Sequence, residues 1–86
     1  MSDTAPESGR AAAVLRYLAT QLADEPERVS VESEPGRRGP RLSVRVAPDD
    51  MGRVIGRRGR TAQAIRTVAR AAAAADGQDI SVDIVD

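Results

Sequence analysis

The sequence predicts a small α+β domain in which helices pack on one face of a three-stranded mixed sheet. Three short runs alternate apolar and polar residues, which is the pattern of half-buried strands, and three other stretches have helical character. Two of the helices fall between the second and third strands. Such a connection favours a right-handed crossover between parallel strands, so the predicted order is helix, strand, strand, helix, helix, strand.

The length of the chain allows one core and leaves no room for a second domain or a deep substrate pocket. Residues 1–9 lack periodicity and contain Pro6 and Gly9, which predicts a disordered tail ahead of a domain at residues 10–86. These residues are acidic and polar, unlike a signal peptide, and no apolar run is as long as a membrane span. We therefore expect a soluble, cytoplasmic protein that makes no membrane contact.

The first helix is predicted over residues 10–23, and Asp24-Glu25-Pro26 ends it. Its apolar face consists of Ala11, Val14, Leu15, Leu18, Ala19 and Leu22. Two strands are predicted next, the first at Val29 and Val31 and the second at Leu42, Val44 and Val46. They form an antiparallel hairpin around a turn at residues 35–40, where Arg37 and Arg38 are interpreted as a solvated loop tip.

Pro48-Asp49-Asp50 is expected to open the next helix, with Asp49 as its N-cap. Two adjacent carboxylates with no histidine or cysteine nearby make a poor metal site, so capping is the preferred interpretation. This short helix ends at Gly56. A longer helix runs to about residue 75, where Asp76-Gly77 closes it, and its expected buried positions are Ile65, Val68, Ala69 and Ala72. The third strand follows at Ile80, Val82 and Ile84.

The candidate functional site is the turn between these two helices, Gly56-Arg57-Arg58-Gly59. Its glycines allow backbone conformations closed to other residues and let a polyanion approach closely. A helix begins after Gly59, so its unpaired N–H groups and positive dipole end face the same spot. A dinucleotide fingerprint and a P-loop are both excluded, because each needs a glycine where Val54 stands. The turn is therefore a predicted phosphate site.

The charge distribution supports this prediction. The formal net charge is zero, but residues 51–75 contain six arginines and no acid, namely Arg53, Arg57, Arg58, Arg60, Arg66 and Arg70. The chain has no histidine, cysteine or lysine, so the usual general bases and nucleophiles are missing and we expect neither enzymatic activity nor a cofactor or metal. Tyr17 is the one aromatic residue and is expected to be partly packed beside Leu18. RNA-recognition motifs and OB-folds, which stack bases on aromatic side chains, are poor alternatives.

The stretch V-I-G-R-R-G-R-T-A-Q-A-I-R resembles the signature loop of a KH domain, in which a G-x-x-G loop clamps the backbone of about four single-stranded nucleotides. The element order resembles the type II, prokaryotic arrangement. The size of the chain and the longer stretch R-V-A-P-D-D-M-G-R-V-I-G-R-R-G-R-T-A-Q-A-I-R resemble the KhpA family of small bacterial KH proteins. That resemblance implies an RNA chaperone or post-transcriptional regulator that pairs with itself or with KhpB, a larger KH protein.

The resulting hypothesis is a module that binds single-stranded RNA, with bases against aliphatic side chains and phosphates against arginines. The expected RNA-binding residues are Arg45, Arg53, Val54, Ile55, Gly56, Arg57, Arg58, Gly59, Arg60 and Arg66, with Arg70 extending the basic edge. The alternative is a protein-interaction module, a dimerisation unit whose partner makes most of the RNA contact. The acidic first strand and tail favour that alternative.

Overall fold

A computed structural model describes residues 9–86, so the predicted tail lies outside the described residues except for Gly9, which begins the first helix. The helices are α1 (Gly9–Leu22), α2 (Met51–Ile55) and α3 (Arg60–Ala75). The strands are β1 (Ser30–Glu34), β2 (Arg41–Arg45) and β3 (Ser81–Val85). Short 3-10 turns occupy Pro26–Arg28, Pro48–Asp50 and Arg57–Gly59. The predicted order of helices and strands is confirmed.

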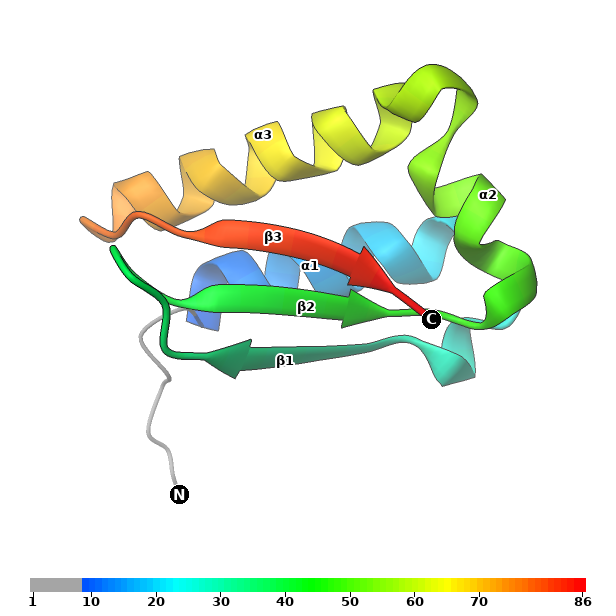
Figure 1. Cartoon of the computed structure of the whole chain (residues 1–86), viewed down its shortest axis with the longest axis horizontal. Helices are drawn as coiled ribbons and strands as arrows, with labels where there is room; N and C mark the ends of the chain where they lie inside the picture. The colour runs from blue at the N-terminus through cyan, green and yellow to red at the C-terminus, as the bar shows by residue number, and fades with distance from the viewer. Residues whose placement is uncertain (1–8) are drawn as a thin grey trace.

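The three strands form one sheet in the order β1-β2-β3 (Figure 1). β1 and β2 pair antiparallel, with Val31 opposite Val44, and β2 and β3 pair parallel, with Leu42 opposite Val82. The hairpin and the parallel crossover are therefore both confirmed. The helices cover one face of this mixed sheet, where Leu42, Val44 and Val82 are buried among residues of α1 and α3. Arg41 and Arg45 alternate with the buried residues of β2 and are exposed.

The core is built from aliphatic side chains and alanines. Leu15 of α1 is fully buried, and Ala11 and Ala19 lie one turn before and after it. On α3 the buried residues recur every three or four positions, at Ala62, Ile65, Ala69 and Ala73. Because alanines line both helices, α1 and α3 pack closely over the sheet.

Two expectations about the core were wrong. The side chain of Val68 is 47% exposed, because the buried stripe of α3 passes through Ile65 and Ala69 and leaves Val68 beyond its edge. Tyr17 was expected to be partly packed beside Leu18, but it is 63% exposed and does not belong to the core cluster. Both residues instead add apolar surface to the outside of the molecule.

The C-terminus of α3 follows the prediction. Gly77 has a φ of +73°, and the N–H groups of Gly77 and Gln78 donate to the carbonyls of Ala74 and Ala73, both at 2.9 Å. These paired bonds satisfy carbonyls that the helix leaves unpaired, and the left-handed conformation explains the glycine. Among residues 9–86, no helix is long and apolar enough to cross a membrane.

Candidate nucleic-acid interface

Residues 56–59, here called the 56–59 turn, join α2 to α3 through an unusual backbone. Gly56, Arg58 and Gly59 have φ angles of +78°, +60° and +74°. At Gly56 this φ is combined with a ψ of 172°, a region that essentially only glycine occupies. The N–H of Gly59 donates to the carbonyl of Gly56 at 3.1 Å, which closes the turn tightly. The sequence prediction of a turn that needs glycine backbone is confirmed.

The two glycines of the turn serve different purposes. A Cβ placed on Gly56 would lie 2.6 Å from the Cβ of Thr61 and 3.0 Å from its backbone nitrogen, so the start of α3 packs directly on Gly56. A Cβ on Gly59 would meet no atom within 4 Å. The backbone at Gly59 is therefore open to a ligand, at the point where the first N–H groups of α3 lack carbonyl partners within the helix.

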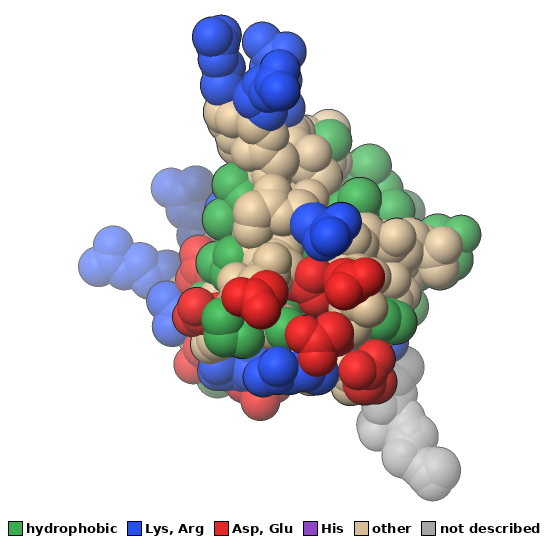
Figure 2. Space-filling model, turned by 90° about the vertical axis from the view of Figure 1, so that its right-hand side faces the viewer, with side chains coloured by type: hydrophobic (Ala, Val, Ile, Leu, Met, Phe, Trp, Pro, Cys, Tyr) green, Lys and Arg blue, Asp and Glu red, His purple; other side chains and the backbone are tan. Residues whose placement is uncertain are grey.

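Three arginines surround this open backbone without internal partners. Arg57, Arg58 and Arg60 are exposed, and none forms an ion pair or side-chain hydrogen bond with another described residue. Figure 2 shows basic side chains projecting from the top of the molecule, where the turn lies, away from the acidic side chains lower down. Since no acid within residues 9–86 neutralises these three arginines, they can bind an anion.

Three of the other four arginines expected at the site, Arg53, Arg66 and Arg45, make contacts within the protein. The Nε of Arg53 lies 3.5 Å from Oδ1 of Asp50. The Nε of Arg66 donates to the carbonyl of Val82 at 3.1 Å, which ties α3 to β3. Arg45, the last residue of β2, donates to the carbonyl of Asp86. Arg70 is exposed about one turn beyond Arg66 on α3 and makes no ion pair with a described residue.

The aliphatic pair before the turn divides between core and surface. Val54 is 0% exposed and its side chain serves the core alone. Ile55, the last residue of α2, is half-buried and adjoins the turn. Of the two residues expected to hold bases, only Ile55 offers accessible aliphatic surface.

Asp50 holds the start of α2 in place by contacts outside its own helix. The capping role expected for the Asp49-Asp50 pair was wrong. Neither carboxylate bonds an N–H of its own helix, and Asp49 is exposed. Asp50 is buried and accepts hydrogen bonds from the backbone N–H groups of Asp24 and Glu25, both at 3.0 Å. The chain just after α1 is thereby tied to the start of α2, which carries the turn.

The hydrogen bonds of Asp50 also change its acidity. The bond from the N–H of Asp24 lowers the pKa of the carboxyl below its ordinary value of 3.8, with further lowering by the N–H of Glu25 and the charges of Arg53 and Arg28. Burial opposes the shift without cancelling it. Sequence reasoning missed this role because the donors precede Asp50 by 25 and 26 residues, and no local pattern records such a contact.

Residues 12–84 match the family model described as "KhpA/KhpB, KH domain". The chain belongs to this KH family. It is 50% identical over 72 residues to the RNA-binding protein KhpA of Streptomyces coelicolor, an alignment that covers 84% of this chain and 87% of the relative. The KhpA protein of Leifsonia xyli is 47% identical, and the alignment covers 87% of this chain and 96% of the relative. The KhpA protein of Mycobacterium tuberculosis is 44% identical, with coverage of 84% of this chain and 86% of the relative. The resemblance to the KhpA family is confirmed.

Two solved structures share the KH fold. Era in complex with MgGDPNP and nucleotides 1506–1542 of 16S ribosomal RNA has a TM-score of 0.60, with 22% identity over 87% of this chain and 29% of that one. An Era variant of Aquifex aeolicus bound to GDP.AlF4- has a TM-score of 0.66, with 22% identity over 99% of this chain and 33% of that one. The chain thus spans about a third of each Era chain. This likeness supports the predicted fold.

Proposed function

We propose that this KH domain binds single-stranded RNA by holding backbone phosphates at the 56–59 turn. Its KhpA relatives are named RNA-binding proteins, and one solved structure of the same fold contains a ribosomal RNA segment. The observation that carries the proposal is the set of three exposed arginines, Arg57, Arg58 and Arg60, without partners among the described residues. They surround an open backbone at the start of a 16-residue helix.

The physical basis of binding is charge neutralisation on a preorganised backbone. The N-terminus of α3 favours anions through its free N–H groups and its dipole, and the arginines add charge-assisted hydrogen bonds to phosphate. The left-handed residues hold the turn in one conformation, so little ordering is needed on binding. A strand bound there passes the half-buried Ile55, and the bond from Arg66 to the carbonyl of Val82 fixes α3 against β3 beside it. Arg53 then supports the site structurally through its ion pair with Asp50.

The proposal is tested by the double substitution Arg57→Asp with Arg58→Asp, measured by fluorescence anisotropy with a labelled four-nucleotide RNA. Each lost charge-assisted contact costs about 1.5–3 kcal/mol, so two cost at least about 3 kcal/mol, or roughly 100-fold in affinity. The fold should survive, because both side chains are exposed and make no contact that stabilises the core. Circular dichroism checks that point.

The chain provides a matched control. Arg10 and Arg16 are both exposed on α1 and have no proposed role in RNA binding, so Arg10→Asp with Arg16→Asp changes the net charge equally. At about 0.15 M salt, charges further apart than about 8 Å are largely screened, so this control should bind the four-nucleotide RNA as the wild type does. If the 57/58 variant is folded and binds RNA equally well, the 56–59 turn is only a helix connector.

A second candidate function is self-association, or association with a larger KhpB-like protein. It is favoured by an apolar groove between α1 and α3, lined by Leu18, Gln21, Leu22, Thr61, Ala64, Ile65 and Val68. Leu22 and Val68 are exposed, and a dimer would cover them. The chain contains a single aromatic residue, and so small a core gains stability from such association. The groove is distinct from the arginines of the turn, so the two functions are compatible.

The substitution Val68→Glu tests this second function by light scattering at tens of micromolar protein. We expect it to yield a monomer that still binds the four-nucleotide RNA, whereas the control Gln63→Glu, also exposed on α3, keeps the wild-type mass. A wild-type protein that is already monomeric, with a melting temperature independent of concentration, contradicts the proposal.

We further propose that the protein acts as an RNA chaperone, as the resemblance to the KhpA family implies. This proposal is supported by the place of the 56–59 turn on the surface, where a strand held through its phosphates would leave its bases accessible for pairing. We expect the protein to accelerate annealing of two complementary RNA strands, and the 57/58 aspartate variant to lose this effect. Equal acceleration by the variant contradicts a chaperone role of the turn.

A further inference from the structure

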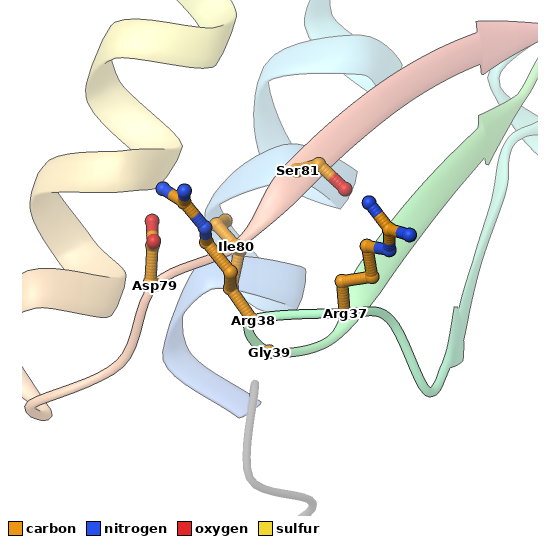
Figure 3. A pocket seen from close by; sticks show the side chains of 6 residues that line it. All are labelled: Arg37, Arg38, Gly39, Asp79, Ile80 and Ser81. Atoms are coloured by element: carbon orange, nitrogen blue, oxygen red, sulfur yellow. The ribbon is translucent and has the colours of Figure 1, made fainter.

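The second Gly-Arg-Arg-Gly sequence, at residues 36–39, lies at the end of the sheet opposite the 56–59 turn (Figure 1). It lines a pocket with the start of β3, formed by Arg37, Arg38, Gly39, Asp79, Ile80 and Ser81. Figure 3 shows the guanidinium of Arg37 pointing toward the Ser81 hydroxyl, while Arg38 extends across Ile80 on the side of Asp79. Two cationic side chains and one hydroxyl therefore border the same hollow.

This loop is held against β3 more firmly than a solvated hairpin tip would be. A Cβ on Gly39 would collide with the backbone carbonyl of Asp79, so the loop and the α3–β3 connection pack backbone to backbone. The N–H of Ser81 also donates to the carbonyl of Pro40 at 3.2 Å. Neither Gly36 nor Gly39 has a positive φ, so at Gly39 close packing, rather than backbone conformation, requires glycine. The arginines between them are consequently presented from a fixed support.

The charge of the pocket favours an anion. Arg37 and Arg38 are exposed and form no ion pair with a described residue. Asp79 is the one acid among the lining residues, so the lining carries two positive charges and one negative, a net charge of +1. Arginine pairs well with phosphate because its planar fork donates two parallel hydrogen bonds, and a hydroxyl such as that of Ser81 adds a third donor.

We propose that Arg37, Arg38 and the Ser81 hydroxyl form a second phosphate-binding site for the RNA strand that the 56–59 turn holds. This inference rests on the proposed function. The two sites lie near opposite ends of α3, whose 16 residues span about 24 Å at about 1.5 Å each. A stacked strand advances about 3.4 Å per nucleotide, so about seven nucleotides separate the sites. A four-nucleotide RNA reaches one site, and RNA of about ten nucleotides reaches both.

The experiment compares wild type with the double variant Arg37→Gln, Arg38→Gln on oligouridines of four and twelve nucleotides. Losing two phosphate contacts should make the log–log salt slope for the twelve-nucleotide RNA shallower by about 1.4, and weaken its binding roughly tenfold at about 0.15 M salt. Affinity for the four-nucleotide RNA should be unchanged, which also shows that the variant is folded. A twelve-nucleotide RNA can bind in more registers than a four-nucleotide RNA, which raises its apparent affinity. This increase is the same for the wild type and the variant, so it cancels when both are compared on the same RNA.

Asp79→Asn supplies a test of opposite sign. Removing the acid that opposes phosphate should tighten binding of the twelve-nucleotide RNA and leave the four-nucleotide RNA unaffected. The 37/38 glutamine variant needs a control for the loss of positive charge. Arg16→Gln, which removes an exposed arginine of α1, provides it and should leave the salt slope unchanged.

The outcomes separate this inference from the function on which it rests. If the 37/38 glutamine variant matches wild type on the twelve-nucleotide RNA while the 57/58 aspartate variant loses binding, the second site is overturned and the proposed function stands. Equal weakening on both RNA lengths also overturns it, because the arginines then act through the general field of the protein. If wild-type protein binds neither oligouridine, the proposed function fails and this inference fails with it.

Discussion

Alanine substitution of three neighbouring glycines should affect stability in three different ways. Gly56 lies in a region of backbone conformation that costs another residue about 1–3 kcal/mol. Its new Cβ would also collide with Thr61, and forced packing of this kind costs about 1–3 kcal/mol more. Gly56→Ala should therefore destabilise the domain by at least about 2 kcal/mol, a large share of the roughly 3–5 kcal/mol that a core of this size supplies.

The other two glycines give smaller effects in opposite directions. Gly59 is left-handed with open space around it, so Gly59→Ala should cost about 1–2 kcal/mol from conformation alone. Gly52 lies within α2 and a Cβ there meets nothing within 4 Å, so Gly52→Ala should stabilise by about 0.5–1 kcal/mol.

The assay is urea unfolding followed by circular dichroism, with the free energy of unfolding extrapolated to water. The expected order of stability is Gly52→Ala, wild type, Gly59→Ala, Gly56→Ala. If Gly56→Ala is as stable as Gly59→Ala, the packing of Thr61 on Gly56 does not constrain the turn, and the description of a rigid, preorganised 56–59 turn is refuted.

Three further predictions concern acid stability, the core and salt. Because the pKa of the Asp50 carboxyl is lowered in the folded state, its stabilising effect is present above the ordinary pKa of 3.8 and is lost as the pH falls below it. The urea midpoint of the wild type should therefore fall between about pH 5 and 2, and that of Asp50→Asn should fall much less. Equal pH profiles of the two proteins contradict this role of Asp50. Leu15→Ala empties a fully buried position and should lower the free energy of unfolding in urea by about 2–5 kcal/mol. A decrease below about 1 kcal/mol would show that neighbouring side chains refill the core. Binding of a four-nucleotide RNA at about three phosphates should give a log–log salt slope near −2, and salt-independent binding excludes phosphate neutralisation.

The fold could be predicted from sequence because its signals are local. Val29 and Val31 alternate with polar residues as a half-buried strand does, and Gly77 stands where a helix end requires a left-handed residue. The connection between β2 and β3 contains helices, and this alone favours a parallel pair. Each of these signals lies within a few residues of the element that it specifies.

The features that sequence did not reveal depend on contacts between distant segments. Asp50 is adjacent to a helix start and therefore resembles a cap, but its carboxylate bonds N–H groups that precede it by 25 and 26 residues. Val68 has helical spacing from Ile65, yet only the position of α1 decides which edge of the apolar stripe is covered. In the same way, the sequence shows the arginines but not which of them, such as Arg53 and Arg66, are engaged within the protein.

The most direct test of the central claim is to map a bound RNA on the protein by NMR. Titration of ¹⁵N-labelled protein with a four-nucleotide single-stranded RNA should shift the amide signals of Gly56, Arg57, Arg58 and Gly59 and of the first turn of α3 more than any others. Signals of Arg16 and Tyr17, on the exposed side of α1, should move little. Shifts concentrated on that outer surface, with the 56–59 turn unaffected, would contradict the claim that RNA binds at the turn.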